Sequence, residues 1–184
     1  MIAFLGVAAL VIVAPGPDFA LTLRNTVRDG GAATALGVAS GQLVWVLATA
    51  AGVAALLAAS HPAFVALRLV GAAYLIWLGT ATLRSRGGHT PRFRIGSPYR
   101  QGLLSNLANP KMPVFFLSLL PQFGGSFLAL TVHGLVFAGL TLAWLLLVAR
   151  GGSLLLIPRV RRIVDVVTGV VLVAFGAHLA TERR

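Results

Sequence analysis

The sequence predicts an all-α integral membrane protein with about six transmembrane helices. Of its 184 residues, 58% are hydrophobic and 10% are charged, whereas an average soluble domain carries about 25% charged residues. A chain of this composition has too little polar surface to cover its apolar residues in water. Its charges are also gathered in breaks between long apolar segments. These observations exclude a soluble globular domain, and the high hydrophobicity excludes an intrinsically disordered chain.

Six apolar segments are close to the length that a membrane-spanning helix needs, which is about 20 residues. Four of these segments run without interruption, and two contain prolines. We predict a single transmembrane domain over residues 1–184. In chain order, the predicted spans are Ile2–Leu23, Ala32–Ala59, Pro62–Leu83, Gln101–Leu120, Phe127–Ala149 and Ile163–Ala180.

The formal net charge of +11 indicates how the chain is oriented and does not indicate nucleic-acid binding. The arginines cluster in three breaks between spans, as they do in cytoplasmic loops under the positive-inside rule. With these clusters in the cytoplasm, both termini are predicted outside. A five-span arrangement and a signal peptide over residues 2–14 are the alternatives. The clusters are Arg24 and Arg28; Arg84, Arg86, Arg92, Arg94 and Arg100; and Arg150, Arg159, Arg161 and Arg162.

Two halves of the chain share one plan. Repeat one covers about 1–85, repeat two covers about 101–184, and a basic loop of about 84–100 joins them. Each repeat has three spans, and the first span of each is interrupted by prolines, at Pro15–Pro17 and at Pro110–Pro113. Because three is an odd number, the two repeats must have opposite orientations in the membrane. This is the inverted-repeat plan of many secondary transporters, whose binding site lies at the interrupted helices.

An ionisable residue accompanies each interruption. A proline opens a helix because it lacks an N–H and clashes with the carbonyl four residues earlier, and open backbone survives in hydrocarbon only against protein or a wet cavity. Asp18 and Lys111, the only lysine, lie beside these breaks, and charges at such depth are normally paired or functional. We predict that both face a common cavity. The alternatives are plain proline kinks, a purely structural Asp–Lys pair, or separate snorkelling to the interface.

Four further polar residues lie in apolar spans. Asn106 and Asn109 adjoin the second break and are predicted either to line the cavity or to hydrogen-bond between helices. Gln42 has the same two interpretations. Asp165 lies about one turn into the sixth span, where it is predicted to pair with Arg162 or to relay protons.

Several kinds of chemistry are excluded by the absence of their residues. The chain has no cysteine, so disulfides, thiolate metal sites and cysteine nucleophiles are excluded. The four histidines have no metal-ligand spacing, and the sole lysine follows a proline instead of the glycine of a nucleotide-binding loop. No HExxH or GxSxG motif occurs. We therefore predict no enzyme, no metal site and no cofactor.

Small residues at helical spacing indicate close helix packing. Gly37 and Gly41 form a GxxxG pattern in the second predicted span, and Gly169 and Gly176 recur in the sixth. Such residues let two helix backbones approach each other. They predict packing faces within the monomer or in a homo-oligomer.

Several ordered motifs resemble a known family, the LysE superfamily of lysine and homoserine/threonine exporter-type translocators. The matches run in order over most of the chain. They are Pro15-Gly16-Pro17-Asp18 followed by Leu23-Arg24-Asn25-Thr26, then Gly71-Ala72-Ala73-Tyr74-Leu75-Ile76-Trp77-Leu78-Gly79, then Asn106-Leu107-Ala108-Asn109-Pro110-Lys111 followed by Leu120-Pro121-Gln122-Phe123.

The resemblance implies a secondary transporter in the bacterial cytoplasmic (inner) membrane. It would export amino acids or similar small metabolites in exchange for protons, and alternating access would come from rocking of one repeat against the other. The residues themselves leave open a passive small-solute or ion channel, efflux of a non-amino-acid metabolite, an intramembrane enzyme and a non-transporting partner subunit. The substrate- or proton-binding candidates are Pro15, Gly16, Pro17, Asp18, Asn106, Asn109, Pro110 and Lys111, with Gln42 and Asp165 as secondary candidates.

Overall fold

The computed structural model describes residues 2–14, 16–59, 61–84, 96–151 and 158–181. All regular structure in these ranges is helical, which confirms the predicted all-α class. In chain order the elements are α1 (Ile2–Val13), α2 (Pro17–Thr26), α3 (Gly31–Ala59), α4 (His61–Arg84), α5 (Pro98–Leu107), α6 (Lys111–Val114), the π-helical turn η1 (Phe115–Leu119), the 3₁₀ turn η2 (Leu120–Phe123), α7 (Phe127–Gly151) and α8 (Pro158–Thr181).

The distribution of polarity differs from that in a soluble protein, because apolar side chains cover the outside and several polar groups are buried inside. Large apolar side chains cover much of the outside; Leu47 and Leu147, for example, are 64% and 62% exposed. The inside holds a carboxylate, amides and hydroxyls. Hydrocarbon around the molecule would solvate the apolar exterior, while polar groups in a lipid environment must find partners inside the protein. Buried polar residues include Asp18, Thr22, Asn25, Gln42, Ser105, Asn106 and Asn109.

Two helices within the described ranges are long and apolar enough to cross a membrane by themselves, Gly31–Gly52 of α3 and Phe127–Gly151. The bent pair of α1 and α2 is a third candidate. The other predicted spans fall on α4, on α5 with α6, and on α8. These do not meet the same test in the described part of the chain, so the six-span layout stays a prediction.

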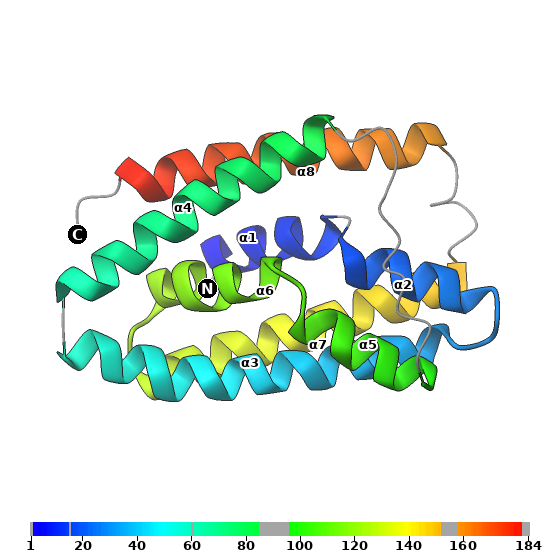
Figure 1. Cartoon of the computed structure of the whole chain (residues 1–184), viewed down its shortest axis with the longest axis horizontal. Helices are drawn as coiled ribbons and strands as arrows, with labels where there is room; N and C mark the ends of the chain where they lie inside the picture. Colours follow the sequence, from blue (N-terminus) through cyan, green and yellow to red (C-terminus); the bar gives the residue numbers. More distant parts are fainter. Residues whose placement is uncertain (1, 15, 60, 85–95, 152–157, 182–184) are drawn as a thin grey trace.

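The helices are arranged in three layers (Figure 1). α4 packs along α8 at the top of the view, α3 packs along both α7 and α5 at the bottom, and α1 and α6 lie between the two layers. α2 and α7 end, and α5 and α8 begin, toward the right of the view. These four helix ends, which flank the predicted arginine-rich connections, therefore lie at one end of the molecule.

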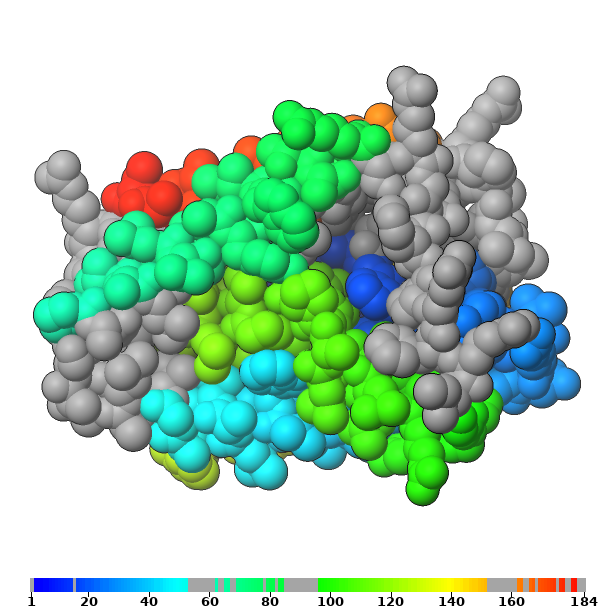
Figure 2. All heavy atoms as spheres, in the orientation of Figure 1, coloured from blue at the N-terminus to red at the C-terminus, as the bar shows by residue number. Residues whose placement is uncertain are grey.

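The central layer is held by the main apolar core. α1 buries Phe4, Val7 and Val11 against α3, α6, η1 and α7. Phe115 of η1 stacks on Phe137 of α7 with ring centroids 3.8 Å apart. In the space-filling view, α6 and η1 fill the space between α3 below and α4 above (Figure 2). The two interrupted segments thus lie inside the protein, where backbone breaks can find polar partners.

Glycines allow the closest helix contacts. A Cβ built on Gly37 of α3 would overlap the backbone of Tyr99, and one built on Gly102 of α5 would overlap that of Thr34. In the upper layer, a Cβ on Gly79 of α4 would lie 2.7 Å from the carbonyl oxygen of Gly169 in α8. The predicted GxxxG face and the predicted glycine face of the last helix are therefore both confirmed as packing faces within the monomer.

Two predicted boundaries are wrong. The sixth helix begins at Pro158, five residues before the predicted Ile163, because a proline suits the first helical turn and arginines tolerate helix. The fourth predicted span, Gln101–Leu120, is interrupted as predicted and is not the alternative of one kinked helix, but its start differs. It begins at Pro98, where the Ser97 side chain accepts a hydrogen bond from the Arg100 N–H, and it continues through α6, η1 and η2 after the break.

Candidate functional site

The first break separates α1 from α2. α1 ends at Val13, α2 begins at Pro17, and the two axes are bent by 56°. Gly16 is the extended residue before α2, and Pro17 occupies the first helical position, where its missing N–H is not needed. The break leaves the last carbonyls of α1 without helical partners. It also puts Asp18 in the first turn of α2, where the helix dipole favours a negative charge.

The second break separates α5 from α6. α5 ends at Leu107, and Pro110 precedes the first residue of α6. The side chain of Asn109 bridges this gap, because its Oδ1 accepts a hydrogen bond from the backbone N–H of Lys111 at 3.0 Å. This local turn is typical of asparagine. It leaves the Nδ2 atom of Asn109 available for a second contact.

That second contact is with Asp18, whose carboxylate receives hydrogen bonds from three side chains around the second break. Ser105 Oγ donates to Oδ1 at 2.7 Å, while Asn106 Nδ2 and Asn109 Nδ2 donate to Oδ2 at 2.8 Å and 3.0 Å. Asp18 is only 7% exposed. An ionised carboxylate accepts hydrogen bonds and donates none, so this set of neutral donors matches it.

Lys111 makes the reciprocal contact with the first break. Its Nζ atom donates to the carbonyl oxygens of Val11 at 3.0 Å and Ala14 at 3.3 Å. A Cβ on Gly16 would lie 3.5 Å from this ammonium nitrogen, in ordinary van der Waals contact. A cation therefore occupies the negative, C-terminal end of α1. Asp18 and Lys111 are both described, and no ion pair joins them.

Each break is thus completed by residues of the other. The aspartate beside the first break is bound by side chains of the second, and the lysine beside the second is bound by backbone of the first. The structure brings Asp18, Lys111, Asn106 and Asn109 together around the two breaks. That Asp18 and Lys111 face a common cavity stays a prediction. The alternative of a direct Asp18–Lys111 salt bridge is not what the structure shows, because neutral groups make the hydrogen bonds of both residues, although the two charges lie near enough to attract each other.

A second polar network continues from Asp18 along α2 and α5. Asn25 Nδ2 donates to Thr34 Oγ1 at 2.9 Å and to Gln101 Oε1 at 3.3 Å. Ser105, which the prediction of site residues missed, lies one helical turn after Gln101 and one turn before Asn109. This i, i+4 spacing of three polar residues in an apolar span was the signal that could have found it.

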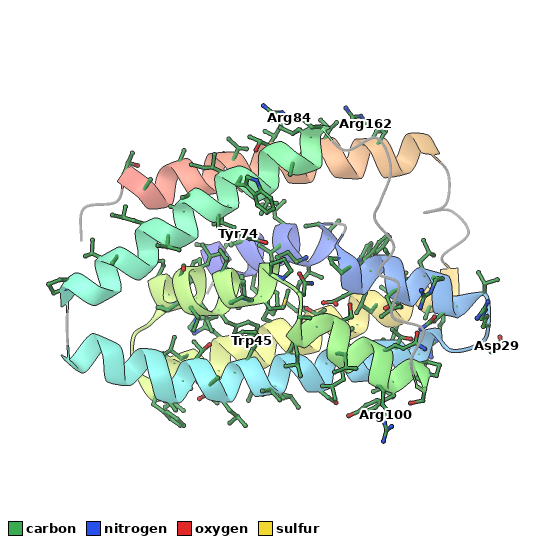
Figure 3. The ribbon with its side chains drawn as sticks, viewed as in Figure 1. Asp29, Trp45, Tyr74, Arg84, Arg100 and Arg162 are labelled. Atoms are coloured by element: carbon green, nitrogen blue, oxygen red, sulfur yellow. The ribbon has the colours of Figure 1, made fainter. Side chains whose placement is uncertain are left out.

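The remaining candidates fall elsewhere. Gln42 is buried on α3, and its Nε2 donates to Thr141 Oγ1 of α7 at 3.1 Å, so it hydrogen-bonds between helices and not to the Asp18 cluster. Trp45, one turn further along α3, stacks on Phe116 of η1 (Figure 3). Pro15 and the side chain of Asp165 lie outside the described residues.

Comparison with known families identifies the chain. The family model described as LysE type translocator matches residues 9–183. The chain belongs to the LysE type translocator family. Members of this family are transport proteins, so this LysE type translocator is not an enzyme.

Named relatives agree with this membership. The translocator is 34% identical to an uncharacterised membrane protein of Pseudomonas aeruginosa, over 93% of this chain and 90% of that protein. It is 31% identical to the threonine efflux protein of Escherichia coli over 98% of both chains. It is also 33% identical to the leucine efflux protein of Salmonella choleraesuis, over 63% of this chain and 59% of that protein. No solved structure matches the chain.

Proposed function

We propose that this LysE type translocator exports a small amino acid from the bacterial cytoplasm by proton antiport with alternating access. Family membership and the efflux proteins among its relatives support amino-acid export. Their names favour a neutral amino acid such as threonine or leucine. The buried Asp18 carboxylate, held between two helix breaks, is the observation that carries the proposal.

The proposed architecture has six spans in two inverted repeats within the cytoplasmic membrane. The contacts between helices support it, because two helices of the first repeat pack on their counterparts in the second, α3 on α7 and α4 on α8. Helices α2 and α5, one half of each interrupted span, also contact each other. The contacts of Asp18 and Lys111 also join the two repeats, because Asp18 binds side chains beside the second break and Lys111 binds backbone beside the first. The ends of α2 and α7 and the starts of α5 and α8, which flank the arginine clusters in the sequence, lie at one end of the molecule and support a cytoplasmic location for that end.

Asp18 is proposed to bind the substrate ammonium and the exchanged proton in alternation. An amino acid needs a place for its ammonium and a place for its carboxylate. In the proposal Asp18 serves the first, and Lys111 with the N-terminal end of α2 serves the second. Ammonium and proton compete for one carboxylate, so a transporter of this design carries one of them in each direction.

Protonation of Asp18 would change the contact between α2 and α5. A neutral carboxylic acid has a donor where the carboxylate had only acceptors. The hydrogen bonds from Ser105, Asn106 and Asn109 then lose the strength that the negative charge of Asp18 gives them. Because this weakens the contact between α2 and α5, the two half-helices are expected to shift relative to each other when the proton binds.

The close packing at glycines favours particular moving units. α4 and α8 are joined through Gly79 and Gly169, and α3 and α5 through Gly37 and Gly102. Both contacts join helices of different repeats. We therefore propose that α4 and α8 move together against α3, α5 and α7, with the two broken segments as the hinge between them, instead of one repeat rocking against the other.

Efflux from liposomes tests the proposal. Purified protein is reconstituted in vesicles loaded with all standard amino acids, a pH gradient is imposed, and mass spectrometry measures which amino acids leave. The Asp18→Asn variant is compared with Asp29→Asn, which removes an exposed aspartate that lies outside the cluster. We expect selective, gradient-dependent efflux that Asp18→Asn abolishes and Asp29→Asn leaves unchanged.

Other results would contradict specific parts of the proposal. Efflux that ignores the pH gradient and shows no counterflow indicates the passive channel. Efflux that persists in Asp18→Asn would show that Asp18 takes no part in the transport cycle. If no amino acid leaves, the amino-acid substrate is wrong.

The orientation has its own test, which the cysteine-free sequence makes simple. Single cysteines replace Val27, which is 80% exposed after α2, and Leu128, which is 71% exposed at the start of α7. A membrane-impermeant maleimide added to intact cells should label Leu128→Cys and not Val27→Cys. In inside-out vesicles the labelling should be reversed. The opposite labelling pattern would show that the protein has the opposite orientation in the membrane.

A further inference from the structure

A polar pocket of about 380 Å³ lies where α2 ends and α5 begins. Its volume is within the range of small-molecule sites, roughly 300–1,000 Å³. The described lining contains two guanidinium groups and no carboxylate, so the pocket favours an anion. α2 ends and α5 begins toward the right of the view in Figure 1. The described residues that line the pocket are Arg24, Asn25, Arg28, Pro98 and Gln101.

The two arginines are held differently. Arg24 is fixed against the pocket wall, since its Nη2 donates to Gln101 Oε1 at 2.9 Å and its Nε to Asn25 Oδ1 at 3.4 Å. Arg28 is exposed, and its guanidinium has no hydrogen-bond partner in the described part of the chain. The pocket therefore has one positioned guanidinium and one that is available to a ligand.

A seam of polar side chains leads from this pocket to Asp18. On α2 it consists of Asn25, Thr22 and Asp18, all buried. On the facing side of α5, Gln101 bonds Asn25 and Ser105 bonds Asp18. The rest of both helices is largely apolar, so this is the polar route from the pocket into the interior of the protein.

We propose that Arg24 and Arg28 bind the carboxylate of the exported amino acid in this pocket before it moves along the seam to Asp18. The inference rests on the proposed function. Arg24 and Asp18 are six residues apart on one helix, which is about 9 Å of helix rise. One small amino acid cannot bridge that distance with its ammonium and carboxylate, so the pocket is an earlier, separate binding position on the cytoplasmic side.

Chemical protection tests binding without transport. The full chain in nanodiscs of phosphatidylcholine is treated with the arginine reagent phenylglyoxal, and peptide mass spectrometry follows the modification of Arg28. Threonine or leucine should slow this modification at least about threefold, the effect of a ligand present at twice its Kd. Threoninol and leucinol, which lack the carboxylate, should not slow it. Arg84, exposed at the end of α4 and outside the pocket, is the control site.

Two results would overturn the proposal. Equal protection of Arg28 by amino acids and amino alcohols would show that the pocket does not recognise the carboxylate. A lipid headgroup shares the chemistry of an oxyanion, so inorganic phosphate and nanodiscs containing phosphatidylglycerol are tested as separate arms. If phosphate and phosphatidylglycerol protect Arg28 and neither amino acid does, the pocket binds a lipid phosphate and not the substrate.

Kinetics separate this proposal from the proposed function. With substrate supplied from the side of the pocket, Arg28→Gln should raise KM about fivefold and leave kcat unchanged, because an exposed binding residue acts before the transport step. Arg84→Gln should change neither constant. A normal KM in Arg28→Gln overturns the pocket while export stands. If the wild-type chain transports no amino acid, the proposed function is wrong. The protection of Arg28 then decides by itself whether the pocket binds an amino acid.

Discussion

The Nζ atom of Lys111 lies 3.0 Å from the carbonyl oxygen of Val11, which is 100 residues earlier in the chain. α1 stops at Val13, so the carbonyls of its last turn have no amide donors beyond the break. The lysine supplies the missing donors and places a positive charge at the negative end of α1. α1 can therefore end inside the protein, because the lysine takes the place of the missing amide donors.

Lys111→Met should destabilise the protein without changing its shape. Methionine has a similar length but leaves the carbonyls of Val11 and Ala14 without donors. The free energy of unfolding should fall by about 1–3 kcal/mol, the cost of unsatisfied buried acceptors. Thermal unfolding in detergent, followed by circular dichroism, measures this change. A melting temperature equal to that of the wild type would show that these hydrogen bonds contribute nothing.

Exchanging the two charges should not restore function. In the double variant Asp18→Lys with Lys111→Asp, an ammonium faces the Nδ2 donors of Asn106 and Asn109, and a carboxylate faces backbone carbonyls. Both contacts become repulsive, because the hydrogen-bond partners of each residue are neutral groups that match only its original charge. Efflux from liposomes and thermal unfolding should both be as poor as in the worse single variant. Recovery of both would indicate a direct pair after all.

Asn109→Asp separates the two roles of Asn109. An aspartate keeps the oxygen that accepts from the Lys111 N–H, but it replaces the Nδ2 donor with a second carboxylate oxygen next to Asp18. Like charges this close disfavour each other. We expect a loss of about 1–3 kcal/mol in unfolding free energy, together with loss of efflux, and partial recovery of both at low pH where one carboxyl is protonated. Unchanged efflux at neutral pH would contradict the cluster.

Two glycines of α3 form a matched pair for testing helix packing. Gly37→Ala puts a Cβ into the backbone of Tyr99, whereas the Cβ of Gly52→Ala meets nothing within 4 Å. Gly37→Ala should lower the melting temperature. Gly52→Ala should leave it unchanged or raise it, because alanine is favoured over glycine in a helix by about 1 kcal/mol. Equal effects of the two variants would refute the close approach of α3 and α5.

Much of this arrangement could be predicted from local pattern. The length and apolarity of the segments predicted helices, and prolines predicted both breaks, because a missing N–H acts within one helical turn. Asp18 and Lys111 stood out because charges are rare in such segments. The start of α8 was placed too late, since arginines were assigned to the loop although they are compatible with a helix.

The contacts that make the site could not be predicted in this way. Ser105 and Asn109 meet Asp18 across 87 and 91 residues of sequence, and no local periodicity carries that information. Gln42 was a secondary candidate in the sequence, and its partner is Thr141 on α7. The choice depends on how closely helix backbones approach, as where the side chain of Asn106 lies against Gly41.

The sequence by itself determined that this chain forms apolar helices, where two of those helices break, and which charged residues accompany the breaks. These properties follow from side-chain chemistry and from interactions within a few residues. Only the tertiary structure decided that Asp18 is bound by amides and a hydroxyl and that Lys111 is bound by carbonyls. The physical reason is that each broken helix end needs hydrogen-bond partners, and packing brought those of the other break into reach.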